Sequence, residues 1–123
     1  MEKNVVEAAR LLRAAAMVDN LDAEVEYAIA LYNGTGTPKD VPTAIALLNR
    51  AARQNSPIAQ NRLARILIDC LGVPVDKVQG FKWHLIAKTA GNGDPDLDAQ
   101  FAQLPPVEKA KAEALAKKWF GTK

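Results

Sequence analysis

Apolar residues recur along most of this chain at intervals of three and four positions, the spacing of one face of an α-helix. The clearest run is the pair Leu47 and Leu48, with alanines before and after it. The pattern breaks at glycine, proline, asparagine and aspartate, which favour turns and helix caps. It predicts seven helices, over residues 5–18, 23–33, 43–54, 58–69, 77–89, 96–104 and 107–120.

Capping residues support several of these boundaries. Gly34 is expected to adopt the left-handed conformation that closes many helices. Asp40 and Asp76 are expected to cap the N-termini of the helices that follow them. We expect the same of Asn4 and Asp22 at the first two helices. The turn between the second and third helices is therefore a C-cap joined to an N-cap.

The turn over residues 34–40 recurs 36 positions later, over residues 70–76. The two turns share a glycine, a proline and an aspartate at equivalent positions. These pairs are Gly36 and Gly72, Pro38 and Pro74, and Asp40 and Asp76. The apolar positions of the flanking helices align at the same offset. Cys70 stands where the first turn has Gly34, so we expect strain or a different closure there. A repeated helix-turn-helix predicts a stack whose neighbours bury each other's apolar faces.

The repeat divides the chain into units of two helices, here called the first-type and second-type helix. We expect one all-α domain over residues 1–123. Its parts are a half repeat with a second-type helix only (4–20), two full repeats (22–56 and 58–91), a first-type helix (96–104) and a terminal capping helix (107–120).

The residues of each unit resemble the Sel1-like repeat, a relative of the tetratricopeptide repeat. That repeat has the pattern L-G-x-x-Y-x-x-G-x-G, a short loop with aspartate, and then A-x-x-W-x-x-x-A-A. Residues 27–36 and 63–72 carry the first part, and Leu47 and Trp83 occupy the tryptophan position. Alanine replaces the first glycine, leucine replaces the tyrosine, and Cys70 replaces a later glycine. The resemblance implies a right-handed α/α superhelix, or solenoid, with a C-terminal capping helix.

The resemblance also implies a non-enzymatic scaffold or adaptor that binds a partner protein or peptide. In related tetratricopeptide arrays the first helices line a concave groove. By position, the groove candidates here are Val25, Ile29, Tyr32, Asn61, Arg65, Ile68, Ala99 and Gln103. Three of these residues, Ile29, Tyr32 and Ile68, lie outside the helix face that packs against neighbouring helices, so they would expose apolar area. Asn61 and Arg65 would bind a peptide backbone or carboxylate. The alternative is that the three apolar residues pack against the neighbouring hairpin.

The helix over residues 5–18 suggests a second hypothesis. It is a second-type helix without a first-type mate, so its outer apolar face lacks a cover. This chain would then be a structural segment of a larger repeat protein, or would form a homo-oligomer through that helix.

Composition excludes several other classes. The net charge of +2 does not favour nucleic acid as a partner. No apolar run reaches about 18 residues, so we expect no membrane insertion. One cysteine excludes an internal disulfide. The residues given show no leader, so we expect a cytoplasmic protein if this is the complete chain and a periplasmic one if a leader has been trimmed.

The sequence offers little chemistry, and we expect no catalytic, cofactor-binding or metal-binding residues. His84, the only histidine, is expected to pack beside Trp83. A hydrolase using Cys70 or His84 is a third hypothesis, weakened by the lack of partner residues in sequence. The alternating aspartates Asp94, Asp96 and Asp98 lack the later residues of a calcium loop, so we expect helix capping.

The last predicted helix ends in an aromatic pair, Trp119 and Phe120, and its lysines are balanced by Glu108 and Glu113. We expect the helix to present a solvated face rather than a nucleic-acid patch. The aromatic pair is expected to fold back over the core, with a partner anchor as the alternative.

Overall fold

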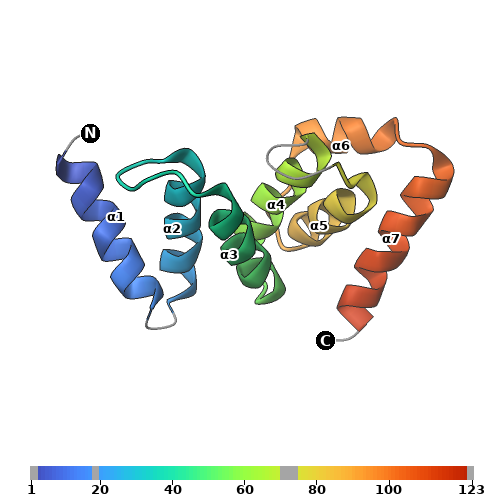
Figure 1. Cartoon of the computed structure of the whole chain (residues 1–123). Coiled ribbons are helices and arrows are strands. Elements are labelled where there is room, and N and C mark those ends of the chain that lie inside the picture. Colours follow the sequence, from blue (N-terminus) through green and yellow to red (C-terminus); the bar gives the residue numbers. More distant parts are fainter. Residues whose placement is uncertain (1–2, 18–19, 70–74, 122–123) are drawn as a thin grey trace. The chain divides into compact units, whose positions relative to one another are not determined.

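The computed structural model describes residues 3–17, 20–69 and 75–121. Within them it contains seven α-helices and no strand (Figure 1). The helices are α1 (Lys3–Ala16), α2 (Leu21–Asn33), α3 (Val41–Arg53), α4 (Pro57–Asp69), α5 (Lys77–Thr89), α6 (Pro95–Ala102) and α7 (Pro106–Gly121). The all-α prediction is confirmed, and no predicted helix end differs from the observed end by more than two residues.

The chain forms two compact units, Met1–Ala59 (unit 1) and Gln60–Lys123 (unit 2). The boundary falls within α4, and each unit is described by itself. The single domain expected from the sequence stays a prediction.

In unit 1, α2 packs against both α1 and α3 (Figure 1). Four alanines, Ala28, Ala44, Ala51 and Ala52, are fully buried, and Leu48 is 1% exposed. Alanine has the smallest side chain that still favours a helix, so helix backbones can approach closely at these positions.

The caps explain where the helices begin and end. Gly34 has φ +72° in the left-handed region, and its N–H donates to the Ala30 carbonyl at 2.8 Å. Asp40 accepts from the Thr43 N–H at 3.2 Å, and Asp76 caps α5 in the same way. These three predicted caps are confirmed.

Two other predicted caps are wrong. Asn20, not Asp22, caps α2: its backbone is extended, and its side chain accepts from the Ala23 N–H at 3.0 Å. The helix therefore starts before Asp22, which lies within its first turn. Asn4 lies inside α1, which already includes Lys3. The strain predicted at Cys70 lies outside the described residues.

In unit 2, α5 contacts α4, α6 and α7. Gly80 lets α4 come close: a methyl group there would lie 2.6 Å from Ile68 Cγ1 and 3.2 Å from the Ala64 carbonyl oxygen. On α7, the Trp119 ring meets Trp83 of α5 edge to face, with centroids 5.2 Å apart. Trp119 thus folds back as predicted, whereas Phe120 is 43% exposed.

Candidate functional site

In unit 1, the three predicted groove residues differ in how accessible they are. Val25 is 3% exposed and belongs to the core. Ile29 and Tyr32, one helical turn apart on α2, are half-buried. Only the latter two therefore offer side-chain surface to a partner, and their role in binding stays a prediction.

In unit 2, Ile68 is 5% exposed because it fills the space that Gly80 leaves on α5. It therefore packs within its own hairpin, whereas the alternative considered from the sequence was packing against the neighbouring hairpin. The same offset of 36 residues relates Ile68 to Tyr32, which stays half-buried. Ala99 and Gln103 are exposed.

Asn61 and Arg65 of α4 both bind Asp94, which caps α6. The Asn61 amide donates to Asp94 Oδ2 at 2.9 Å, and the Arg65 guanidinium lies 2.7 Å from the same oxygen. Asp94 also accepts from the backbone N–H groups of Asp96 and Leu97 at 3.2 and 3.4 Å. These contacts tie α6 to α4, so a partner that reached either side chain would compete with Asp94.

The charge on Asp94 is stabilised by this arrangement. Burial raises the pKa of the Asp94 carboxyl. The hydrogen bonds from Asn61 and the Leu97 N–H, together with the charge and hydrogen bond of Arg65, outweigh burial, and the pKa falls below its ordinary value.

A second polar cluster ties α6 to α5. His84 is fully buried, and its Nε2 lies 2.8 Å from Asp98 Oδ1. The Lys88 ammonium donates to the same oxygen at 3.1 Å. Hydrogen bonds from His84 and then from Lys88 lower the pKa of Asp98. Capping is thus confirmed for Asp94 but wrong for Asp98, which lies one turn further along and faces α5.

The hydrolase hypothesis gains no support from these residues. His84 is 0% exposed, so its ring is out of reach of a substrate, and it packs near Phe81 at 6.3 Å between ring centroids. Cys70 lies outside the described residues. Among the residues described, no group of three or more His, Cys, Asp or Glu side chains is placed to hold a metal ion. Of the described helices, none combines the length and apolarity needed to cross a membrane.

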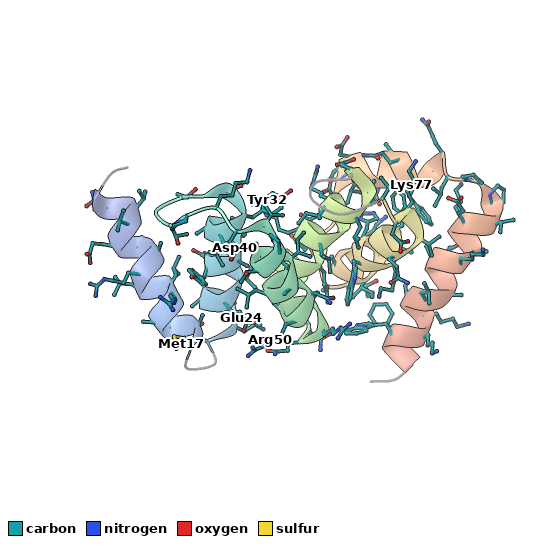
Figure 2. The ribbon with its side chains drawn as sticks, in the orientation of Figure 1. Met17, Glu24, Tyr32, Asp40, Arg50 and Lys77 are labelled. Atoms are coloured by element: carbon teal, nitrogen blue, oxygen red, sulfur yellow. The ribbon has the colours of Figure 1, made fainter. Side chains whose placement is uncertain are left out.

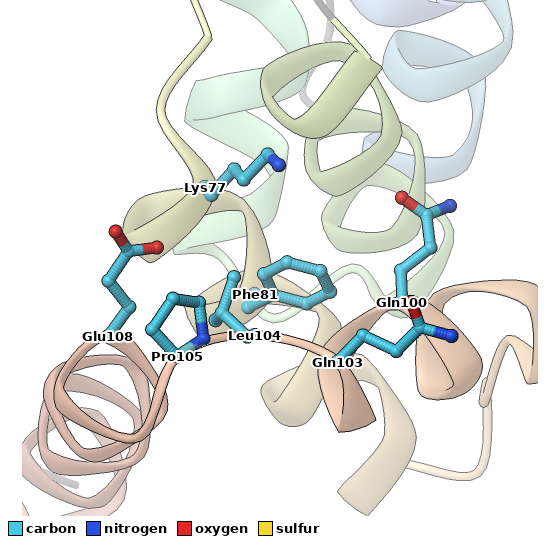
Figure 3. Close-up of a pocket in the computed structure, with 7 residues that line it drawn as sticks. All are labelled: Lys77, Phe81, Gln100, Gln103, Leu104, Pro105 and Glu108. Atoms are coloured by element: carbon cyan, nitrogen blue, oxygen red, sulfur yellow. The ribbon is translucent and has the colours of Figure 1, made fainter.

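One pocket of unit 2 contains a predicted groove residue. It measures about 430 Å³ and lies between α5, the end of α6 and the start of α7 (Figure 3). We call it the α5–α7 pocket. Its lining consists of Lys77, Phe81, Gln100, Gln103, Leu104, Pro105 and Glu108. Phe81 and Leu104 are buried side chains, whereas the two glutamines are exposed.

The repeats match a known protein family. The profile of the Sel1 repeat matches residues 1–20, 21–56 and 57–92. The chain belongs to the Sel1 repeat family. Repeats of this family generally serve protein–protein interaction, and the resemblance inferred from the sequence is confirmed.

A solved Sel1-like structure matches almost the whole chain. It is the crystal structure of a protective antigen present in uropathogenic Escherichia coli strains, which displays an SLR fold. The TM-score is 0.89 and the sequence identity 27%, and the match covers 98% of this chain and 27% of that one. This Sel1 chain therefore spans about a quarter of the length of the protein it matches. The search of curated proteins found no match.

A further pocket lies between the Sel1 second-type helices α1 and α3 of unit 1. We call this cavity of about 460 Å³ the α1–α3 pocket. Its lining consists of Arg13, Ala16, Met17, Glu24, Tyr27, Thr43, Leu47 and Arg50. Glu24 is 3% exposed, and its Oε1 lies 3.3 Å from Arg50 Nε. Figure 2 shows these two side chains next to each other.

Sequence reasoning missed the α1–α3 pocket. The available signal was the tryptophan position of the Sel1 repeat, which holds a leucine in α3 and a tryptophan in α5. A smaller side chain at a position where two helices meet leaves space unless the helices move together.

Proposed function

We propose that the chain is a protein–protein interaction scaffold that holds a partner peptide or surface along its first-type helices. The α5–α7 pocket is one of the contact points in this proposal. The observation that carries it is the placement of the exposed Gln100 and Gln103 amides beside the apolar Phe81 and Leu104 in one cavity.

The chemistry of this pocket suits a peptide. A glutamine side chain offers both a carbonyl acceptor and an NH₂ donor, so it complements the two polar groups of a peptide bond. The apolar residues Phe81 and Leu104 can contact an apolar side chain of the peptide, and Lys77 and Glu108 add one positive and one negative charge. Pockets of about 300–1,000 Å³ with apolar walls and few polar groups are typical of ligand sites.

The test begins with capture of a partner from native lysate, identified by mass spectrometry. The double variant Gln100→Ala/Gln103→Ala is expected to bind the purified partner about tenfold more weakly than the wild type, because two hydrogen bonds of about 0.5–1.5 kcal/mol each are lost. Isothermal titration calorimetry measures the change.

Gln54→Ala is the matched control, because this exposed glutamine lies outside the pocket. It should leave the affinity unchanged. Equal affinities of the double variant and the wild type would contradict a role for the α5–α7 pocket. Arg65→Glu is a poor test, since it would place a third carboxylate beside Asp94 and Asp96 and disturb α6.

A second candidate function is assembly through the exposed face of α1. On this helix Ala8 is exposed and Leu11 is 62% exposed. Ala9 is the buried apolar residue of the described part of α1. This face is suited to packing against another repeat or against a second copy of the chain.

Under this second candidate, the wild type self-associates and Leu11→Asp shifts it to monomer, because a carboxylate in an apolar contact is costly to bury. Multi-angle light scattering measures the mass of both. Val107→Asp, at a 66% exposed valine of α7, is the control and should not change the mass. A wild type that remains monomeric at high concentration argues against self-assembly.

A further inference from the structure

In unit 2 the second-type helix α5 packs against the capping helix α7, whereas in unit 1 the second-type helices α1 and α3 each pack against α2. In unit 2, Trp83 of α5 and Trp119 of α7 form an edge-to-face pair with an interplanar angle of 70°. These two residues are 36 positions apart, the repeat spacing. The same spacing leads back from Trp83 to Leu47 of α3 and Leu11 of α1. Unit 1 therefore has two leucines where unit 2 has two indole rings.

The smaller residues leave room in unit 1. Leu47 lines the α1–α3 pocket of about 460 Å³, whereas Leu11 is 62% exposed and does not belong to the described lining. Ala16 and Met17 add apolar surface from the end of α1, and Tyr27 adds an aromatic side chain from α2. The apolar half of the pocket lining, formed by Ala16, Met17, Tyr27 and Leu47, is thus suited to contact with an aromatic ring.

The charges around this pocket are unequal. Its described lining contains two arginines, Arg13 and Arg50, and one acid, Glu24, which gives a net charge of +1. Glu24 is paired with Arg50 at 3.3 Å. Arg13 lines the pocket from α1 and is exposed. Both Arg13 and Glu24 are described residues, and the ion pair given for Glu24 is with Arg50. A negatively charged group is therefore favoured near Arg13.

We propose that the α1–α3 pocket binds an aromatic side chain of a partner protein, carried on an acidic segment. This proposal rests on the scaffold function and adds a second contact point with its own specificity. The aromatic ring packs against Leu47, which stands at the repeat position that Trp83 occupies in unit 2. A carboxylate next to that residue in the partner meets Arg13. Aromatic side chains bury about 150–250 Å² and dominate interface energies, so one ring accounts for most of the affinity.

The experiment titrates the full chain with unlabelled, N-acetylated and C-amidated pentapeptides, followed by ¹H–¹⁵N NMR. The probe is Asp-Glu-Trp-Asp-Glu. The controls are Asp-Glu-Ala-Asp-Glu, which lacks the ring, and Lys-Lys-Trp-Lys-Lys, which reverses the charge. We expect the probe to bind about tenfold more tightly than either control, with the largest shifts at the pocket-lining residues.

Two variants test the pocket itself. Leu47→Trp introduces the residue that unit 2 has at this repeat position, so it fills the cavity, and we expect probe binding to be lost while helicity by circular dichroism is kept. Arg13→Glu leaves the cavity open and should lower the affinity for the probe about tenfold. Arg53→Glu, an exposed arginine outside the pocket, is the matched control for charge and should leave binding unchanged.

Several outcomes overturn the proposal: no binding of the tryptophan probe, equal binding of the alanine peptide, or full binding by Arg13→Glu. If Leu47→Trp does not fold, the Arg13→Glu result still decides whether the probe binds at the α1–α3 pocket. A native partner that is captured equally well by the wild type and by Arg13→Glu supports the scaffold function and rejects this site. A wild-type chain that captures no partner rejects the scaffold function itself.

Discussion

Replacing Gly36 by alanine is expected to destabilise unit 1 by about 2–4 kcal/mol. Gly36 has φ +76°, a conformation that costs an L-residue about 1–2 kcal/mol. The site is also closed, because an added methyl group would overlap the Val5 carbonyl oxygen and lie 2.5 Å from its carbonyl carbon. Since this neighbour is the backbone of α1, either α1 or the turn has to move.

Two other glycines separate these two causes. Gly91 has φ +90° with no atom within 4 Å of an added methyl group, so Gly91→Ala isolates the backbone strain. Gly93 has no positive φ, and the nearest neighbour of its methyl group would be Lys88 Cγ at 3.6 Å, an ordinary contact. Gly93→Ala should change the stability by no more than about 0.5–1 kcal/mol.

Urea denaturation followed by far-UV circular dichroism measures the three losses, and hydrogen exchange of α1 shows where the Gly36 variant opens. The order of loss should be Gly36, then Gly91, then Gly93. A Gly36→Ala protein no less stable than Gly91→Ala, with α1 still protected, would mean that α1 does not lie against the turn.

The sequence predicted the helices well because their signals are local. Gly34, Asp40 and Asp76 act on backbone groups within four residues, so each cap is recognisable in a short window. Asn20 was missed because Asp22 is an equally good capping residue two positions away. The prediction identified Gly36 as a repeat position but not its contact with Val5, about thirty residues earlier.

The candidate groove was less predictable, because accessibility depends on contacts between helices. Ile68 is buried because Gly80 leaves space for it, a small change at one position of the repeat. Asn61 and Arg65 were expected to be available, yet both bind Asp94, some thirty residues later. Asp94 was correctly expected to cap a helix. A capping side chain can also bind side chains from another helix, and no local sequence pattern reveals such a contact.

Replacing Asp94 by alanine is expected to destabilise unit 2 by about 2–3 kcal/mol. An N-cap side chain contributes about 1 kcal/mol, and hydrogen bonds to a charged group about 1.5–3 kcal/mol, reduced here because the Arg65 side chain is 38% exposed. Asp94→Asn keeps an acceptor for the cap and should lose less. Tryptophan fluorescence during urea denaturation measures the loss, since both tryptophans, Trp83 and Trp119, lie in unit 2.

The contribution of Asp94 should also depend on pH, with a sign that follows from its lowered pKa. The pKa of Asp94 in the folded chain lies below its ordinary value of 3.8, so the unfolded chain binds the proton first as the pH falls. The ionised carboxylate therefore stabilises unit 2 fully above about pH 4, and this stabilisation is lost as the pH falls through the folded pKa. The stability difference between wild type and Asp94→Asn should be largest near neutral pH and shrink below about pH 4.

Two neighbouring aspartates, Asp96 and Asp98, serve as comparisons that show whether the effect belongs to Asp94. Asp96 is 70% exposed and 3.7 Å from Arg65, so Asp96→Asn should change the stability by about 0.5 kcal/mol or less. Asp98 also has a lowered pKa, through His84 and Lys88, and will leave some acid dependence in the Asp94→Asn protein. A stability difference that is independent of pH would mean that the charge on Asp94 contributes nothing and that only its role as a cap matters. Equal losses in Asp94→Asn and Asp96→Asn would show that Asn61 and Arg65 do not hold α6, and would leave those two side chains available to a partner.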